Sequence, residues 1–167
     1  MPILLDAIDT VLGSVSGARL IVAGDGPDRA EAEAAHDRLD HRDRVLLAGH
    51  VDGIPGLLAA ADVFVNPALA ESFPYGILEA MAIGCPIVVT DAGGSAEAIV
   101  DGESGLVVPP GDAAALASAL LALLADRDRA RRLGEAAAAR VREQFTRERM
   151  IAGTAAVYAE LGARIDG

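Results

Sequence analysis

The chain has 167 residues, with 25 acidic and 14 basic side chains that give a formal net charge of −11 at pH 7. Its length suits one domain with a real hydrophobic core, and its acidic balance argues against nucleic acid or an anionic membrane surface as the main partner. A single cysteine, Cys85, excludes a disulfide framework. In its Gly-Cys-Pro setting, this residue is expected to be small, buried and structural.

The sequence offers no segment that would take the chain to a membrane. Its N-terminus has no basic stretch followed by an apolar run, so no signal peptide is expected. The longest apolar tract, residues 113–125, contains Ser118 and is too short and too rich in alanine to span a bilayer. A cytoplasmic location is the resulting expectation.

The first part of the chain alternates Ala- and Leu-rich helical stretches with short, β-branched apolar runs. The runs lack polar alternation, which is typical of parallel strands covered on both faces. In chain order we expect a helix at 3–15, a strand at 19–23, a helix at 28–39, a strand at 44–48, a helix at 54–60 and a strand at 63–66.

The alternation continues and then ends in helices alone. We expect a helix at 76–83, a strand at 86–90, a helix at 95–100, a strand at 105–108, and helices at 112–125, 127–143 and 147–161. This order predicts a single α/β domain over residues 1–167, with a doubly wound, Rossmann-like parallel sheet, helices on both faces, and a helical tail at 112–167.

Loops with unusual composition follow the first four expected strands. They are residues 24–27, residues 49–51, the segment around Glu71, and residues 91–94. Ligands of doubly wound sheets bind outside the carboxyl ends of the strands. These loops are therefore expected to line one rim.

Two carboxylates lie eight residues apart around an expected helix start, just after the third of these strands. Pro74 and Gly76 separate Glu71 from Glu79, and proline is favoured only in the first turn of a helix. Glu71 is therefore expected on the loop, and Glu79 in the opening turns of a helix that runs to Gly84. The N-terminus of such a helix attracts anions.

The segment from Glu71 to Glu79 resembles the E-x7-E signature of retaining, nucleotide-sugar-dependent glycosyltransferases of the GT-B fold. Further segments are similar to that family and follow one another in the family's order. They are residues 20–27 with a GDGP turn, 45–51, 61–67, 90–97 and 101–109. The resemblance implies that the chain is the C-terminal, donor-binding domain of such an enzyme.

The resemblance also implies a role for each rim residue. Glu71 would act at the donor sugar as the catalytic residue, Glu79 would bind ribose hydroxyls, and backbone N–H groups between them would meet sugar and phosphate. The implied donor-binding residues are Gly24, Gly49, His50, Val51, Phe73, Tyr75, Gly76, Ile77 and Glu79. Many relatives have glycine where Pro74 stands, and proline lacks the N–H group that such a contact needs.

The chemistry of these groups suits a nucleotide sugar. Charged acceptors bind hydroxyls about twice as strongly as neutral ones do, and backbone amides can cradle a diphosphate. Charge on both sides of the breaking bond would help the leaving group to depart from an oxocarbenium-like sugar. The resemblance implies no cofactor and no tightly bound metal.

The family's catalytic unit has two domains, with the active site in the cleft between them. This chain has no counterpart of the acceptor-binding domain, nor of the strand whose Arg and Lys neutralise the donor pyrophosphate; its basic residues are all arginine. We therefore expect an N-terminal acceptor domain or partner chain elsewhere, little transferase activity from the isolated chain, and peripheral membrane contact only through that domain. The family's last helix crosses to the other domain, so an apolar face at Ile151, Ala155 and Tyr158 would favour self-association.

Other interpretations remain open. Glu79 could merely complement a helix dipole, and Gly24-Asp-Gly26 could suggest a dinucleotide loop, although the third glycine of that fingerprint is missing. The tripeptide Asp126-Arg-Asp128 copies a metal-binding motif of another glycosyltransferase fold, but a helix cap explains it better. The three histidines have no metal-ligand spacing, and His50 is expected to be solvent-exposed.

For the whole chain, the main alternative is a non-catalytic or relic half-domain that acts as a nucleotide-sugar-binding or regulatory module. A third option is the phosphorylase or epimerase chemistry of the same superfamily. The spacing of Glu71 and Glu79, and the lack of a lysine for a cofactor Schiff base, argue against it.

Overall fold

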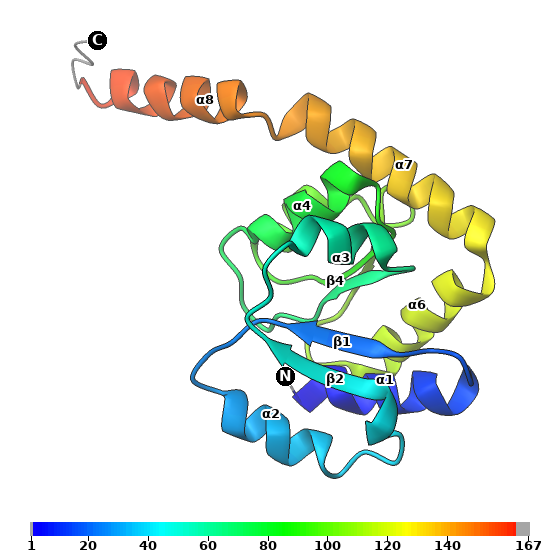
Figure 1. Ribbon diagram of the computed structural model, residues 1–167. Helices are drawn as coiled ribbons and strands as arrows, with labels where there is room; N and C mark the ends of the chain where they lie inside the picture. Colours follow the sequence, from blue (N-terminus) through cyan, green and yellow to red (C-terminus); the bar gives the residue numbers. More distant parts are fainter. Residues whose placement is uncertain (1, 163–167) are drawn as a thin grey trace.

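The computed structural model describes residues 2–162, and Figure 1 shows how its helices surround the strands. In chain order the elements are α1 (Pro2–Ser14), β1 (Leu20–Ala23), α2 (Arg29–His36), the 3-10 helix η1 (Arg42–Arg44), β2 (Val45–Gly49), α3 (Ile54–Ala60), β3 (Phe64–Asn66), α4 (Tyr75–Ile83), β4 (Ile87–Thr90), α5 (Gly94–Ala98), β5 (Leu106–Val108), α6 (Ala113–Ala125), α7 (Arg127–Gln144) and α8 (Arg147–Glu160).

Every expected helix and strand is found within residues 2–162, and most of the ends differ by one or two residues. The largest difference is at α2, which ends at His36 rather than at Leu39. Arg38 and Leu39 donate to carbonyl oxygens three residues back instead of four, so the last turn is no longer α-helical. The 3-10 helix at Arg42–Arg44 is an element that the sequence did not indicate.

All strand pairs are parallel, as the continuous apolar runs predict. β1 pairs with β2, with Leu20 opposite Val45. β4 lies between β3 and β5 in a second, three-stranded sheet. Because parallel strands end at the same edge, the loops that follow the strands of each sheet share one side of that sheet.

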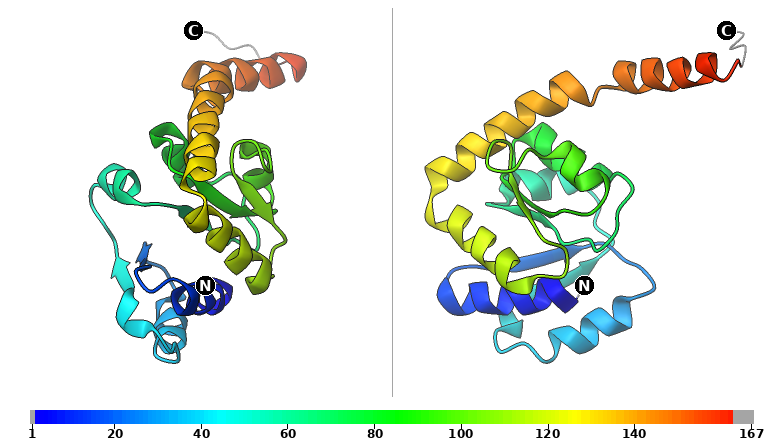
Figure 2. Two further views of the ribbon diagram at one scale, coloured as in Figure 1. Left: turned by 90° about the vertical axis from the view of Figure 1, so that its right-hand side faces the viewer. Right: turned by 180° about the vertical axis from the view of Figure 1, so that it is seen from behind.

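β4 is the centre of the hydrophobic core, and all four of its residues are buried. Side chains alternate across a strand, so Val88 joins one core cluster while Ile87 and Val89 join the other. Helices α1 and α6 pack on the first cluster and α4 on the second, while α7 contributes to both. Figures 1 and 2 show these helices on the two faces of the strands. The chain therefore has the doubly wound α/β arrangement with helices on both faces.

Helix α1 shows how the apolar pattern fixes this packing. Its buried side chains recur at helical spacing on the face that packs against α6. They are Leu4, Leu5, Ala7, Ile8, Val11 and Leu12. Burying one such leucine stabilises the fold by about 1.5–3 kcal/mol. Arg44 closes the helix end, since its guanidinium donates to the Leu12 carbonyl at 2.7 Å and supplies a donor that the last turn lacks.

Helix α7 approaches the end of α4 backbone to backbone. α4 ends at Gly84, which has φ of +78°, a left-handed conformation that glycine adopts without strain. A side chain on Gly134 of α7 would overlap the Gly84 carbonyl oxygen. Gly134 is therefore what allows this close approach, and Gly84 supplies the left-handed turn that ends α4.

The parallel strands form two sheets, and no backbone ladder joins β1 to β3 in the described residues. Figure 1 shows β1 between β2 and the three-stranded sheet. β1 and β3 thus each keep one unpaired edge, and Ile21 of β1 is 46% exposed. The chain does not close the sheet by pairing these two strands.

Helix α8 extends away from the rest of the molecule, as all three views in Figures 1 and 2 show. None of its residues is buried, and its exposed apolar side chains include Ile151 and Tyr158 from the expected apolar face. Across residues 2–162, no helix combines the length and the apolar character that a membrane span needs.

Candidate functional site

The predicted acidic loop, residues 67–74, lies between β3 and α4, as expected from Pro74 and Gly76. Its start is tied to the ends of two strands: the Thr90 hydroxyl of β4 donates to the Ala68 carbonyl, and the Asn66 side chain of β3 accepts from the Ala68 N–H at 3.1 Å. Thr90 is only 1% exposed. The loop is therefore held by partly buried hydrogen bonds at the carboxyl edge of the sheet.

The middle of the acidic loop rests on the glycine pair that follows β4. The Gly94 N–H donates to the carbonyl oxygens of Glu71 at 3.3 Å and Ser72 at 3.1 Å. A side chain on Gly93 would overlap the Glu71 carbonyl oxygen, and one on Gly94 would overlap that of Ser72. Two rim segments that are far apart in the sequence thus meet through backbone atoms.

Glu71 itself is half-buried, and its Oε1 accepts from the Ser72 N–H at 3.2 Å. Glu79 lies on the exposed side of α4, four residues after the first residue of the helix. The structure therefore confirms that one carboxylate lies on the loop and the other on the helix.

The start of α4 offers backbone donors, although fewer than the sequence indicates. Pro74 caps the helix in an extended conformation and has no N–H group. The Ile77 N–H donates to the Pro74 carbonyl at 3.2 Å, and the Ile77 side chain is fully buried. The N–H groups of Tyr75 and Gly76 belong to the first turn, whose donors have no partner within a helix. Tyr75 is 75% exposed.

A second group of predicted residues lies at the carboxyl ends of β1 and β2. The Gly24 N–H donates to the Gly49 carbonyl at 2.7 Å, and both glycines have positive φ values that suit this close turn. The imidazole of His50 is 83% exposed, as predicted, and its Nε2 lies 3.4 Å from Oδ1 of Asp52. Val51 is partly buried beside it in the chain.

The structure also places a basic residue here that the sequence analysis missed. The Arg29 guanidinium lies against Gly49, where Nη1 would be 3.0 Å from an added side-chain atom. Arg29 forms ion pairs with Glu33 at 2.8 Å and Asp25 at 3.8 Å. From the sequence it resembles an ordinary helix-surface arginine with a partner four residues on, which is why it gave no functional signal.

The predicted residues therefore form two groups, one on each sheet. Gly24, Gly49 and His50 belong to the two-stranded sheet, whereas Glu71 and Glu79 belong to the three-stranded sheet. For the described residues, no hydrogen bond or ion pair joins the two groups directly. Each group is a shallow edge built mainly from backbone.

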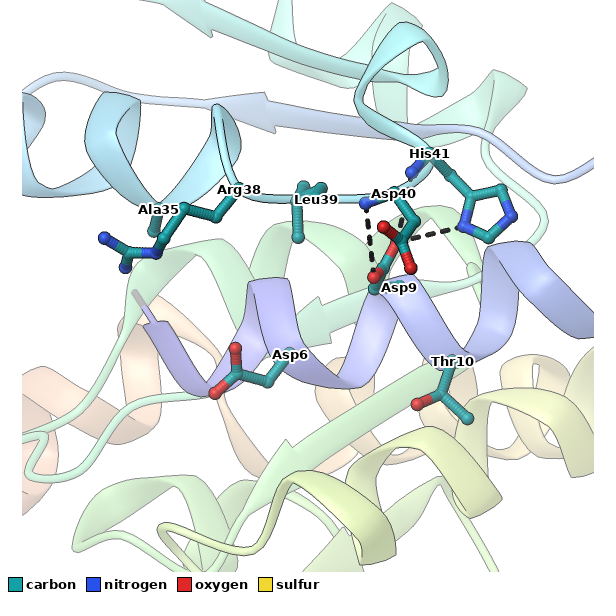
Figure 3. A pocket seen from close by; sticks show the side chains of 8 residues that line it. All are labelled: Asp6, Asp9, Thr10, Ala35, Arg38, Leu39, Asp40 and His41. Atoms are coloured by element: carbon teal, nitrogen blue, oxygen red, sulfur yellow. Dashed lines mark hydrogen bonds and ion pairs between the residues drawn. The ribbon is translucent and has the colours of Figure 1, made fainter.

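A hollow lies elsewhere, between α1 and the segment after α2, with a volume of ≈ 350 Å³ (Figure 3). Inside it the Asp9 carboxylate accepts from Nδ1 of His41 at 3.0 Å, from the His41 N–H at 3.2 Å and from the Asp40 N–H at 3.4 Å. Desolvation raises the pKa of Asp9, but these hydrogen bonds outweigh it and hold the pKa below its usual value. This network fastens a loop to α1 and includes none of the predicted site residues.

The other candidate groups have structural roles. The Asp126 side chain accepts from the Arg129 N–H at 2.8 Å, which confirms that it caps α7. Cys85 is 3% exposed, and burial raises the pKa of its thiol to about 11. Between Pro2 and Gly162, no three His, Cys, Asp or Glu side chains gather as metal ligands would.

Comparison with known proteins gives consistent matches. The family model for glycosyl transferases group 1 matches residues 1–126. The chain is 36% identical over 141 residues to N-acetyl-alpha-D-glucosaminyl L-malate synthase of Bacillus anthracis, covering 84% of this chain and 37% of that protein. It is 37% identical over 127 residues to phosphatidyl-myo-inositol mannosyltransferase of Mycobacterium leprae, covering 74% and 33%.

Solved structures of similar fold include a ligand complex. Anabaena Alr3699/HepE in complex with UDP-glucose has a TM-score of 0.83 and 28% identity, with 93% of this chain and 44% of that chain covered. Sucrose-phosphate synthase from Thermosynechococcus elongatus has a TM-score of 0.80 and 30% identity, with 95% and 42% covered. The chain spans about a third of the length of the Bacillus anthracis and Mycobacterium leprae proteins.

Proposed function

Because the chain belongs to the glycosyl transferases group 1 family, we propose that it binds a nucleotide sugar and forms the donor-binding half of a retaining glycosyltransferase. The acceptor side of the cleft then comes from a further domain or a partner chain. The short coverage of the relatives supports this division, since the matched part is about a third of each.

The observation that carries the proposal is the attachment of the acidic loop to the Gly93–Gly94 turn. The Gly94 N–H bonds to the loop carbonyls, and the loop begins on buried Thr90. A carboxylate that must act at a reacting sugar needs this kind of fixed backbone, because small misplacements cost much of the rate. Glu71 is the acid held in this way.

The roles follow from the chemistry of each group. Glu71 binds the donor sugar and stabilises the positive charge that develops as the glycosidic bond breaks. Glu79 accepts hydrogen bonds from ribose hydroxyls. The backbone from Phe73 to Gly76, at the N-terminus of α4, faces the diphosphate, while Gly49 to Val51, with Gly24, lies beside the base.

A similar solved structure supports the class of ligand. Anabaena HepE, 27–28% identical to this chain, has been solved with UDP and with UDP-glucose. Several curated relatives carry glycosyltransferase names with different sugars. We therefore propose the class of donor, a nucleoside diphosphate sugar, and not a particular sugar or base.

A non-catalytic nucleotide-sugar-binding module is the second candidate. Arg29, the basic residue beside Gly49, is already paired with Asp25 and Glu33. The rim thus offers little unpaired positive charge of its own to a leaving diphosphate. If no other chain supplies that charge, binding without transfer is the expected behaviour.

Titration calorimetry with UDP, GDP and their sugars tests the proposal. Glu79→Ala should weaken binding of both the nucleotide and the nucleotide sugar, whereas Glu71→Ala should weaken mainly the nucleotide sugar. The loss expected for a charged hydrogen bond is about 1.5–3 kcal/mol. Glu135→Ala is the matched control, because Glu135 is an exposed acid paired with Arg131 on α7.

Two results of the same titrations would contradict the proposal. Equal weakening of free nucleotide by both variants would contradict the assigned roles. If none of the three alanine variants, at Glu71, Glu79 or Glu135, changes the affinity, the acidic loop does not contact the donor. Sugar transfer to an acceptor, measured with and without an added acceptor domain, separates the transferase from the binding module.

A further inference from the structure

The acidic loop makes an aromatic contact outside the rim. Phe73, directly after Ser72 in the loop, packs against Phe145 with ring centroids 5.5 Å apart and an interplanar angle of 42°. Phe145 follows the last residue of α7 and precedes Thr146, the N-cap of α8. The loop is therefore braced by the junction between two tail helices.

Arg140 joins the same junction to helix α5. Its Nε donates to the Ala98 carbonyl and its Nη2 to the Glu97 carbonyl, both at 2.8 Å. These carbonyls lie at the end of α5, where a helix has acceptors without partners of its own. The guanidinium carbon also lies 5.5 Å from the centroid of the Phe145 ring, a distance that suits a cation–π interaction.

Helix α5 completes the connection to the acidic loop. Its last residues are held by Arg140, and its first residue, Gly94, bonds to the carbonyls of Glu71 and Ser72. Phe73 also packs on Gly94, since its ring would lie 2.7 Å from an added side-chain atom there. Two routes thus lead from α7 to the loop, one through α5 and one through the phenylalanine pair.

We propose that Arg140 and Phe145, which we name the tail clamp, are positioning residues for the acidic loop and set how well Glu71 meets the donor sugar. This inference rests on the proposed function. Neither residue is among those assigned to the donor. The clamp acts by holding Phe73 and Gly94. Phe73 lies two residues after Glu71, and the Gly94 N–H donates to the Glu71 carbonyl.

The clamp also links the site to the N-terminal end of α8. Phe145 lies directly before a helix that has no buried residue and extends from the molecule. A partner or domain that moves α8 therefore displaces Phe145 first. Such a displacement loosens Phe73 and the acidic loop, while Glu79 on α4 and the residues beside the base keep their places.

Binding measurements on the full chain test the clamp. Phe145→Ala and Arg140→Ala should weaken UDP-glucose binding about three- to tenfold, the range expected when an aromatic or cation–π contact is lost. UDP binding should fall less, because Glu79 lies outside the clamp and UDP has no donor sugar for Glu71 to bind. Phe145→Tyr, which keeps the ring, should restore UDP-glucose affinity. Arg140→Lys should not, because it lacks the planar fork whose two nitrogens reach the two carbonyls.

Two controls match these variants in chemistry. Tyr158→Ala removes an aromatic ring from the exposed surface of α8, and Arg131→Ala removes an arginine that pairs with Asp128 and Glu135 on α7. Both should leave UDP-glucose binding unchanged. An equal loss in these controls would show that the effect is general and would overturn the clamp.

A second readout needs no ligand. Hydrogen exchange of the Gly94 amide reports the bonds to the acidic loop, so Phe145→Ala and Arg140→Ala should speed it while the controls and Phe145→Tyr do not. Unchanged Gly94 exchange in both clamp variants would overturn the inference. If Glu71→Ala leaves UDP-glucose binding intact, the proposed function fails, and this exchange alone then decides whether the clamp holds the loop.

Discussion

Glu71 owes its position to main-chain atoms of its neighbours rather than to its own carboxylate. The Glu71 carbonyl accepts from Gly94, and the next two residues of the loop are held by Gly94 and Phe145. Replacing the carboxylate therefore removes a charge and the hydrogen bond from the Ser72 N–H, but it keeps the contacts with Gly94 and Phe145. This separation makes Glu71→Ala a test of chemistry rather than of folding.

The buried thiol of Cys85 gives a pH-dependent prediction. Its pKa rises from 9.0 to about 11 on folding, because burial disfavours the thiolate. The neutral thiol thus adds stability that is fully present below pH 9 and is lost as the pH rises through 11. A rise of this size corresponds to about 2–3 kcal/mol.

Urea unfolding of the wild-type chain and of Cys85→Ala, at pH 8 and at pH 11, measures this contribution. The stability difference between the two proteins should shrink by that amount at the higher pH, because alanine has no proton to lose. Subtracting the variant cancels the titration of tyrosines, which both proteins share. A pH-independent difference would show that the thiol titrates normally.

At the scale of elements, the contact between α4 and α7 depends on glycine. A side chain on Gly134 would overlap the Gly84 carbonyl, so Gly134→Ala should push α7 away from α4. We expect a loss of about 1–3 kcal/mol, despite the better helix propensity of alanine. Urea unfolding measures it.

Gly153→Ala in α8 is the matched substitution. No atom lies within 4 Å of the place that its new side chain would take, so only helix propensity acts. It should leave the fold as stable as before or more stable by up to about 1 kcal/mol. The same sign for both substitutions would mean that the close approach of α7 and α4 is not the cause.

The elements and the acidic loop could be predicted from the sequence, because both depend on local patterns. Apolar runs and helical spacing determine which residues form strands and helices, and Pro74 separates loop from helix. The contacts of Gly134 with Gly84 and of Phe73 with Phe145 could not be predicted. Periodicity shows which face of an element is buried but not which distant residue it meets.

At the scale of the whole molecule, the described residues leave two features uncovered: the strand edges between the two sheets, and helix α8. β1 and β3 keep unpaired edges, and an open strand edge is a template for pairing with another chain. The apolar side chains of α8, among them Ile151 and Tyr158, are exposed. Both features predict a molecule that is either labile at these edges or associates through them.

Hydrogen exchange combined with light scattering decides between these outcomes. β4 is bonded on both sides, so its amides should exchange slowest and serve as the internal reference. The amides of β1, which contains Ile21, and of β3 should exchange faster in the monomer, because alternate N–H groups of each strand face an open edge. At higher protein concentration, association through the edges should slow them. A monomer at all concentrations, with β1 and β3 protected as fully as β4, would show that the gap between the sheets is not open in solution.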